Sequence, residues 1–147
     1  MPDPFESAHR KIARAREHAT ELEREFQAFL IEPPYETFSE PHPQIPQRIV
    51  HKVRLARPLP AKLSEIAGDM IGNLRETLDH AVFGVAVASG CSHPRNAYFP
   101  FSSTQAGFEA NLKGRCKDVP QEIYSLLREF EPYEGGNEVL FALGIFT

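Results

Sequence analysis

The sequence has no tryptophan, only two cysteines and no apolar run long enough to cross a membrane. Cys91 and Cys116 belong to no CxxC motif, and in a chain of this length they are more typical of free, half-buried thiols than of a disulfide or zinc framework. A membrane-spanning helix needs about 20 predominantly apolar residues. The first residues carry charges where a secretion signal has an apolar stretch. We therefore expect a cytoplasmic protein without a membrane segment.

The chain also lacks the excess of positive charge that is typical of proteins that coat nucleic acids. Its formal net charge is -4 over 147 residues, and 41% of the residues are hydrophobic and 24% charged. This composition is that of a folded domain and excludes a disordered chain. We expect a single helical-bundle domain over residues 1–147, and the charge still allows a small, local RNA site.

Apolar residues recur at three- and four-residue spacing in two long segments, residues 4–31 and 61–88, which predicts two amphipathic helices. Residues 35–56, between them, are rich in β-branched and aromatic residues around a proline-rich connector, which predicts a two-stranded antiparallel hairpin. Because such a hairpin is marginally stable alone, we expect it to pack on the helices. Shorter helices are expected at about 104–113, from Pro120 onward, and at 138–146. The predicted fold class is mainly α, an antiparallel helical bundle with an inserted two-stranded β-hairpin.

The last segment, residues 138–146, is almost uniformly apolar. A helix that is apolar on every side is normally buried inside a larger assembly. We therefore expect either that a partner subunit covers this segment or that the chain is shorter than the fold from which it derives.

The second long helix carries a group of polar side chains on the face opposite its apolar stripe, taking about 100° per residue. They are Asn73, Arg75, Glu76, Asp79 and His80, of which Arg75 borders the apolar stripe. One interpretation is the solvated face of an amphipathic helix. The other is a catalytic site, because histidine moves protons near neutral pH and arginine holds a phosphate through two hydrogen bonds.

Arg75 and His80 together suit metal-independent RNA cleavage, in which the 2′-hydroxyl attacks the neighbouring phosphate. Asn73, Glu76 and Asp79 would support them. One helix places Arg75 and His80 more than a third of a turn apart, so two helices that meet across a two-fold axis would form a composite pocket. This interpretation predicts a homodimer.

The segment from Arg75 to His80 resembles the Arg-x4–6-His pattern of HEPN domains, helical bundles that often dimerise and include many RNases of toxin and phage-defence systems. The longer run Gly68-Asp-Met-Ile-Gly-Asn-Leu-Arg-Glu-Thr-Leu-Asp-His80 resembles the GD-x-x-x-NLR-x-x-LDH segment of a widespread, uncharacterised bacterial family. Phe99-Pro-Phe101 and residues 127–133 resemble later segments of that family. The resemblance implies a HEPN-like RNA-binding or RNA-cleaving protein with catalytic Arg75 and His80. Members of that family continue past the equivalent of Phe146, which implies a C-terminal segment truncated relative to them.

Other candidate sites, for a metal ion or a cofactor, have incomplete sets of ligands or motifs. Asp69, Glu76 and His80 could bind a divalent metal, since Glu76 and His80 lie one turn apart on the helix. His9 and His18 are expected on the surface of the first helix. No glycine-rich phosphate loop or common hydrolase motif occurs, so no cofactor is predicted. The alternative function is a non-catalytic helical interaction or dimerisation module.

Overall fold

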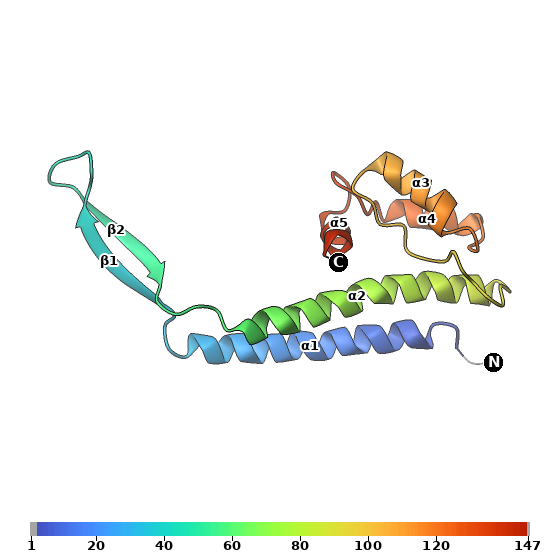
Figure 1. The fold of residues 1–147 in the computed structure, drawn as a ribbon, viewed down its shortest axis with the longest axis horizontal. Helices are drawn as coiled ribbons and strands as arrows, with labels where there is room; N and C mark the ends of the chain where they lie inside the picture. Colours follow the sequence, from blue (N-terminus) through green and yellow to red (C-terminus); the bar gives the residue numbers. More distant parts are fainter. Residues whose placement is uncertain (1–2, 147) are drawn as a thin grey trace.

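The computed structural model describes residues 3–146, and these form a mainly helical fold with one antiparallel hairpin (Figure 1). This confirms the predicted fold class. The elements, in chain order, are α1 (Glu6–Leu30), β1 (Tyr35–Pro41), β2 (Ile49–Leu55), α2 (Ala61–Ala88), α3 (Gln105–Arg115), α4 (Glu122–Glu129) and α5 (Glu138–Ile145).

The two long helices, α1 and α2, lie side by side and antiparallel, and α2 lies between α1 and the C-terminal helices (Figure 1). Prolines and a glycine in the sequence explain where these two helices begin and end. Pro33 and Pro34 follow α1 closely, and proline disfavours helical conformation in the residue before it. Pro60 precedes the first residue of α2, and Gly90, with a φ of 95°, follows its last turn. Gly is favoured in that left-handed conformation.

The hairpin pairs Tyr35 with Leu55 at its base and Pro41 with Ile49 near its tip. It projects beyond the end of the α1–α2 pair and does not pack against the helices in the described chain (Figure 1). The expectation that it packs on the helices is therefore wrong. The short connections at Pro34 and Arg57 direct the strands away from the bundle: both Ala56 and Arg57 donate backbone hydrogen bonds to the Pro34 carbonyl oxygen.

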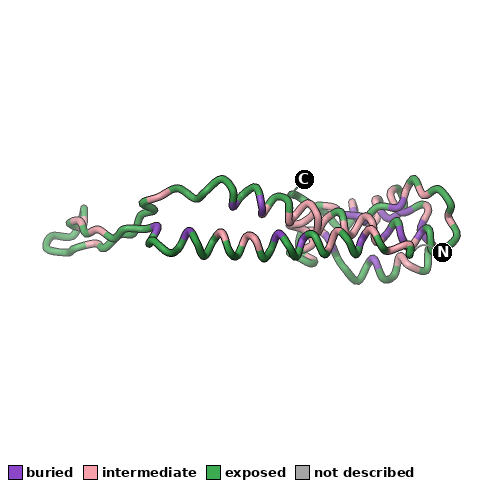
Figure 2. Tube along the Cα trace, turned by 90° about the horizontal axis from the view of Figure 1, so that it is seen from below, coloured by how far each residue is buried: buried purple, intermediate pink, exposed green. Residues whose placement is uncertain are grey.

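The hydrophobic core lies where α3, α4 and the segment 97–101 cover the C-terminal half of α2. Phe99, Phe108 and Leu112 are almost completely buried there. The Phe99 ring lies 4.7 Å from that of Phe101 and 6.0 Å from that of Phe130, between centroids, a range in which aromatic pairs attract. Figure 2 shows the buried residues gathered at this end, while the half of the helix pair nearest the hairpin is largely exposed.

The last helix, α5, begins where Asn137 accepts a hydrogen bond from the Leu140 backbone N–H at 3.1 Å. It lies against α2 and close over Phe101, since a Cβ at Gly144 would come within 2.9 Å of that ring. None of the residues of α5 is fully buried. Among the described residues, no helix has the length and apolarity needed to span a bilayer.

Both cysteines are free, as the sequence predicts; Cys116 is buried and Cys91 is half-buried. The prediction for His18 is wrong, because this side chain is 6% exposed. It lies on the same side of α1 as Ala15, the side that faces α2, whereas His9 is exposed as expected. Ala8 and Ala15 are buried on this same side of the helix.

Candidate functional site

The polar face of α2 is not a free, solvated surface, because it faces α1. Glu76 of α2 forms an ion pair with Lys11 of α1. Asn73 and His80, one turn before and one turn after Glu76, are half-buried. The reason is that, in this part of α2, the apolar stripe packs against the C-terminal helices, which leaves the polar side against α1.

His80 lies at the junction of two adjoining pockets. One, of about 330 Å³, is lined by Ser7, Arg10, Lys11, Arg14, Asn73 and His80, and we call it the cationic pocket. The other, of about 360 Å³, is lined by Ser7, Glu76, Asp79, His80, Phe83, Ala97 and Tyr98, and we call it the aromatic pocket. Ser7 and His80 belong to both, so the two pockets adjoin, and we call them together the His80 groove.

The wall of the cationic pocket comes from one face of α1. Ser7, Arg10, Lys11 and Arg14 follow the three- and four-residue spacing that places side chains on one side of a helix. The three cations have carboxylate partners outside the pocket. Arg14 bonds to Glu17 at 2.7 Å, and Arg10 lies 3.8 Å from Glu6. No carboxylate lines the pocket itself within the described residues, although Lys11, like the two arginines, is paired with a carboxylate just outside it, that of Glu76.

The aromatic pocket offers two exposed rings. Phe83 is 44% exposed and Tyr98 is 46% exposed. The Arg115 guanidinium lies over the Tyr98 ring, 5.5 Å from its centroid, a cation–π arrangement that adds positive charge beside this pocket. Exposed aromatic rings next to cations are typical of surfaces on which nucleic-acid bases stack.

The segment that carries Tyr98 is fixed from two sides. The Phe99 backbone N–H donates a 2.8 Å hydrogen bond to Asp79 Oδ1, and the Cys116 thiol donates to the Tyr98 carbonyl oxygen at 3.1 Å. Burial raises the pKa of the Cys116 thiol to about 11, so this group stays protonated and remains a donor at neutral pH. The position of Tyr98 is thus determined by buried, satisfied groups.

Arg75 is not in the groove. Its guanidinium lies over the Phe101 ring, 5.1 Å from the centroid, and its Nε is buried without a hydrogen-bond partner among the described residues. Phe101 belongs to the core beside α5, on the other side of α2 from α1. Within one chain, therefore, the structure does not bring the predicted catalytic pair Arg75 and His80 into one pocket.

The three residues expected in supporting roles have separate structural contacts. Asp79 anchors Phe99, as described above. Asn73 donates from its amide to the Asp69 carbonyl oxygen at 2.8 Å, and Glu76 is held by Lys11. Asp79 and Glu76 line the aromatic pocket, while Asn73 lines the cationic one. They surround His80, and no hydrogen bond joins its ring to any of the described residues.

Polar groups outside the groove have local structural roles. His42 accepts backbone hydrogen bonds from Gln44 and Ile45 in the hairpin loop. The backbone N–H groups of Arg95 and Asn96 donate to Asp118 Oδ2 at 2.6 and 2.7 Å, which lowers the pKa of this carboxyl group. Among the described residues, no group of three His, Cys, Asp or Glu side chains is placed to hold a metal ion.

Two sets of groove residues were missed by the sequence analysis, the cations of α1 and the exposed rings of the aromatic pocket. The spacing of Arg10, Lys11 and Arg14 on one helical face was an available signal. Phe83 and Tyr98 gave none, because their proximity depends on how the segment 97–101 folds back onto α2. No protein-family model matches this chain, and neither a curated protein nor a solved structure matches it.

Proposed function

We propose that this chain is a HEPN-like RNA-binding protein that cleaves RNA without a metal ion, like the RNases of toxin and phage-defence systems. The observation that carries the proposal is the position of His80, between three cations on one side and two exposed rings on the other. An RNA strand has this same alternation of phosphate and base. Its phosphate would lie in the cationic pocket, and a neighbouring base would stack on Tyr98.

The chemistry assigned to this groove is transesterification. The 2′-oxygen attacks the adjacent phosphorus as it loses its proton, the bond from phosphorus to the 5′-oxygen breaks, and that oxygen gains a proton. His80 would accept the proton from the 2′-oxygen and return it to the 5′-oxygen, since an imidazole nitrogen can accept a proton and its conjugate acid can donate one. Arg10 and Arg14 would neutralise the charge that develops on the phosphate. We assign them this role because Arg75 packs on Phe101 within its own chain.

The test uses fluorescently labelled single-stranded RNA, with binding followed by anisotropy and cleavage by gel. His80→Ala should abolish cleavage, a loss of about 10²–10⁴-fold, while His9→Ala, which removes an exposed histidine of α1, should not change the rate. Arg14→Ala should weaken binding and reduce the slope of log affinity against log salt by about 0.7, the value for one phosphate contact with a single strand. Arg16→Ala, an exposed arginine outside the pocket, is the control.

Each result bears on a specific part of the proposal. Equal affinity of wild type, Arg14→Ala and Arg16→Ala for RNA would refute binding in the cationic pocket. Loss of cleavage on adding EDTA would refute the metal-independent mechanism. Loss of cleavage in Arg75→Ala, with normal stability, would mean that a second copy brings Arg75 to the His80 groove.

A second candidate function is a non-catalytic interaction module that forms homodimers. Exposed apolar side chains support it. Val139 and Ile145 of α5 are 77% and 58% exposed, and the hairpin carries further exposed apolar residues. Large contiguous apolar patches on a protein surface are typical of interaction sites. Light scattering that gives a strict monomer at every concentration would refute this function.

A further inference from the structure

The two faces of the hairpin differ in chemistry. The register places Tyr35 opposite Leu55, Thr37 opposite Val53, Ser39 opposite His51 and Pro41 opposite Ile49, and all of these side chains lie on one face because residues two apart in a strand share a face. Four of them form what we call the apolar hairpin face: Tyr35, Ile49, Val53 and Leu55, which are 56%, 63%, 68% and 57% exposed.

On the opposite face of the hairpin, the carboxylates are paired with cations of the same face. Glu36 pairs with Arg54 and Glu40 with Lys52, each across the two strands. The Arg54 guanidinium also lies 5.2 Å from the centroid of the Phe38 ring. This face also carries Phe38 and Val50, which are half-buried, whereas every residue of the apolar hairpin face is exposed.

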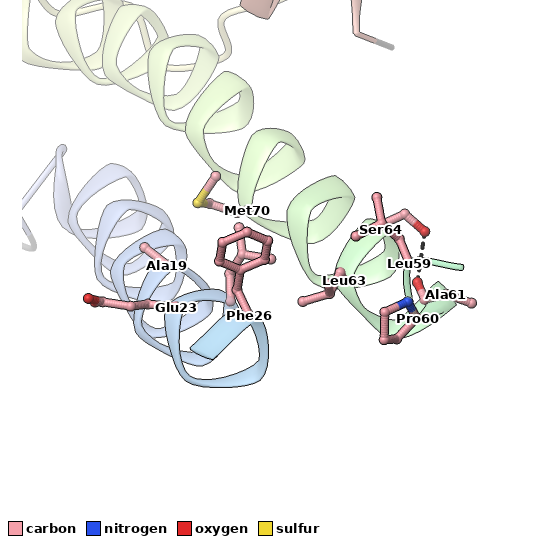
Figure 3. Close-up of a pocket in the computed structure, with 10 residues that line it drawn as sticks. Ala19, Glu23, Phe26, Leu59, Pro60, Ala61, Leu63, Ser64 and Met70 are labelled. Carbon is pink, nitrogen blue, oxygen red and sulfur yellow. Dashed lines mark hydrogen bonds between the residues drawn. The ribbon is translucent and has the colours of Figure 1, made fainter. Parts of the chain in front are cut away.

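A complementary hollow lies at the base of the hairpin, between α1 and α2. It has a volume of about 580 Å³, and we call it the base groove. Its apolar lining includes Leu22, Phe26, Leu59, Leu63 and Met70. Figure 3 shows the Phe26 ring pointing from α1 toward α2, near Met70 and Leu63. Phe26 is 44% exposed and Leu59 is 59% exposed, so the groove is open.

We propose that the apolar hairpin face docks in the base groove of a second copy of this chain, and that the same contact is made in return across a two-fold axis. This inference rests on the interaction-module function above and is independent of the RNA site. A two-stranded hairpin is marginally stable without a further packing partner, and within the described chain it has none. Both surfaces lie at the same end of the molecule, so one two-fold axis can satisfy both at once.

The apolar area that this contact would bury is close to the lower limit for a specific dimer interface. Six side chains, the four of the apolar hairpin face with Phe26 and Leu59, would each bury roughly 100 Å², a typical value for a large apolar side chain. The two contacts together then bury on the order of 1,200 Å², the lower limit for a specific interface. Interfaces near this lower limit are typical of weak, transient association.

The charge distribution favours protein over other occupants. Residues 35–55 carry Glu36 and Glu40 against Arg48, Lys52 and Arg54, a balance close to neutral, within a chain of formal net charge -4. An anionic membrane surface or an RNA would attract a basic segment, and this hairpin has no such excess.

The experiment measures mass by light scattering after gel filtration of the full chain, from about 1 μM to about 300 μM, which brackets a micromolar Kd. Val53→Lys places a charge on the apolar hairpin face, and Leu59→Lys places one at the mouth of the base groove. Val50→Lys is the matched control, since it makes the same change in the same strand on the opposite face, next to Glu40. Circular dichroism melts check that each variant is folded.

Wild type and Val50→Lys should dimerise with the same Kd, and Val53→Lys and Leu59→Lys should each raise the Kd at least tenfold. A monomeric wild type at every concentration would overturn the proposal, as would a Val53→Lys variant that dimerises like wild type. Flotation of wild type, but not Val53→Lys, with phosphatidylcholine vesicles would instead assign the face to lipid. Unchanged RNA affinity in Val53→Lys separates this interface from the His80 groove.

Discussion

Asp79 links α2 to the segment that completes the aromatic pocket, through one hydrogen bond from the Phe99 N–H to its carboxylate. A hydrogen bond to a charged group contributes about 1.5–3 kcal/mol when the acceptor is lost and the donor stays buried. Replacing Asp by Ala inside a helix returns about 0.5 kcal/mol of helix propensity. We therefore expect Asp79→Ala to lower the free energy of unfolding by about 1–2.5 kcal/mol.

The measurement is urea unfolding followed by circular dichroism, with thermal melts beside it. In a domain of this size, each kcal/mol lowers Tm by roughly 2–4 °C. Asp79→Asn keeps an oxygen acceptor without the charge, so its loss should be about half that of Asp79→Ala. Asp69→Ala is the control, because Asp69 is exposed in the same helix. Asp69→Ala should leave the free energy of unfolding unchanged or raise it slightly.

The reasoning would be refuted if Asp79→Ala and Asp69→Ala unfolded with free energies within about 0.5 kcal/mol of each other, the usual range for surface substitutions. That result would mean that the hydrogen bond to Phe99 contributes little.

Three further predictions concern stability and thiol chemistry. Leu112→Ala, in the centre of the core, should cost about 2–5 kcal/mol in urea unfolding, whereas Leu126→Ala, 49% exposed, should cost well under half of that. The pKa of Asp118 is lowered by two backbone N–H donors, so its contribution to stability is full above its ordinary pKa of 3.8 and is lost as pH falls through the lower folded pKa. Asp118→Asn should therefore flatten the acid dependence of the urea midpoint, and an unchanged slope would contradict this. Alkylation near pH 8 with mass spectrometry should label half-buried Cys91 in the folded protein and buried Cys116 only with denaturant; equal labelling would contradict the assigned burial.

The helix pair could be predicted from the sequence because its determinants are local. The structure has α2 at Ala61–Ala88, as predicted, between a proline before it and a glycine after it. The strands of the hairpin were predicted close to their observed positions for the same reason. The direction in which the hairpin projects could not be predicted. It depends on the short connections to the helices, and no periodic pattern in the sequence encodes it.

The candidate site could be predicted only in part. The sequence identified the polar face of α2 and His80 within it, but periodicity cannot say which neighbour lies against a face. Arg75 borders the apolar stripe, and in the fold this position takes it to Phe101 instead of the groove. The cations of α1 reach His80 through antiparallel helix packing, a contact between residues about 70 positions apart that no local signal encodes.

Photo-crosslinking tests the RNA proposal most directly. Single-stranded RNA that contains 4-thiouridine would be irradiated with the full chain, and the crosslinked peptides would be identified by mass spectrometry. The account predicts crosslinks at Phe83 or Tyr98, which line the aromatic pocket beside His80, and their loss in Arg14→Ala but not in Arg16→Ala. Crosslinks confined to the hairpin or to α5 would contradict it.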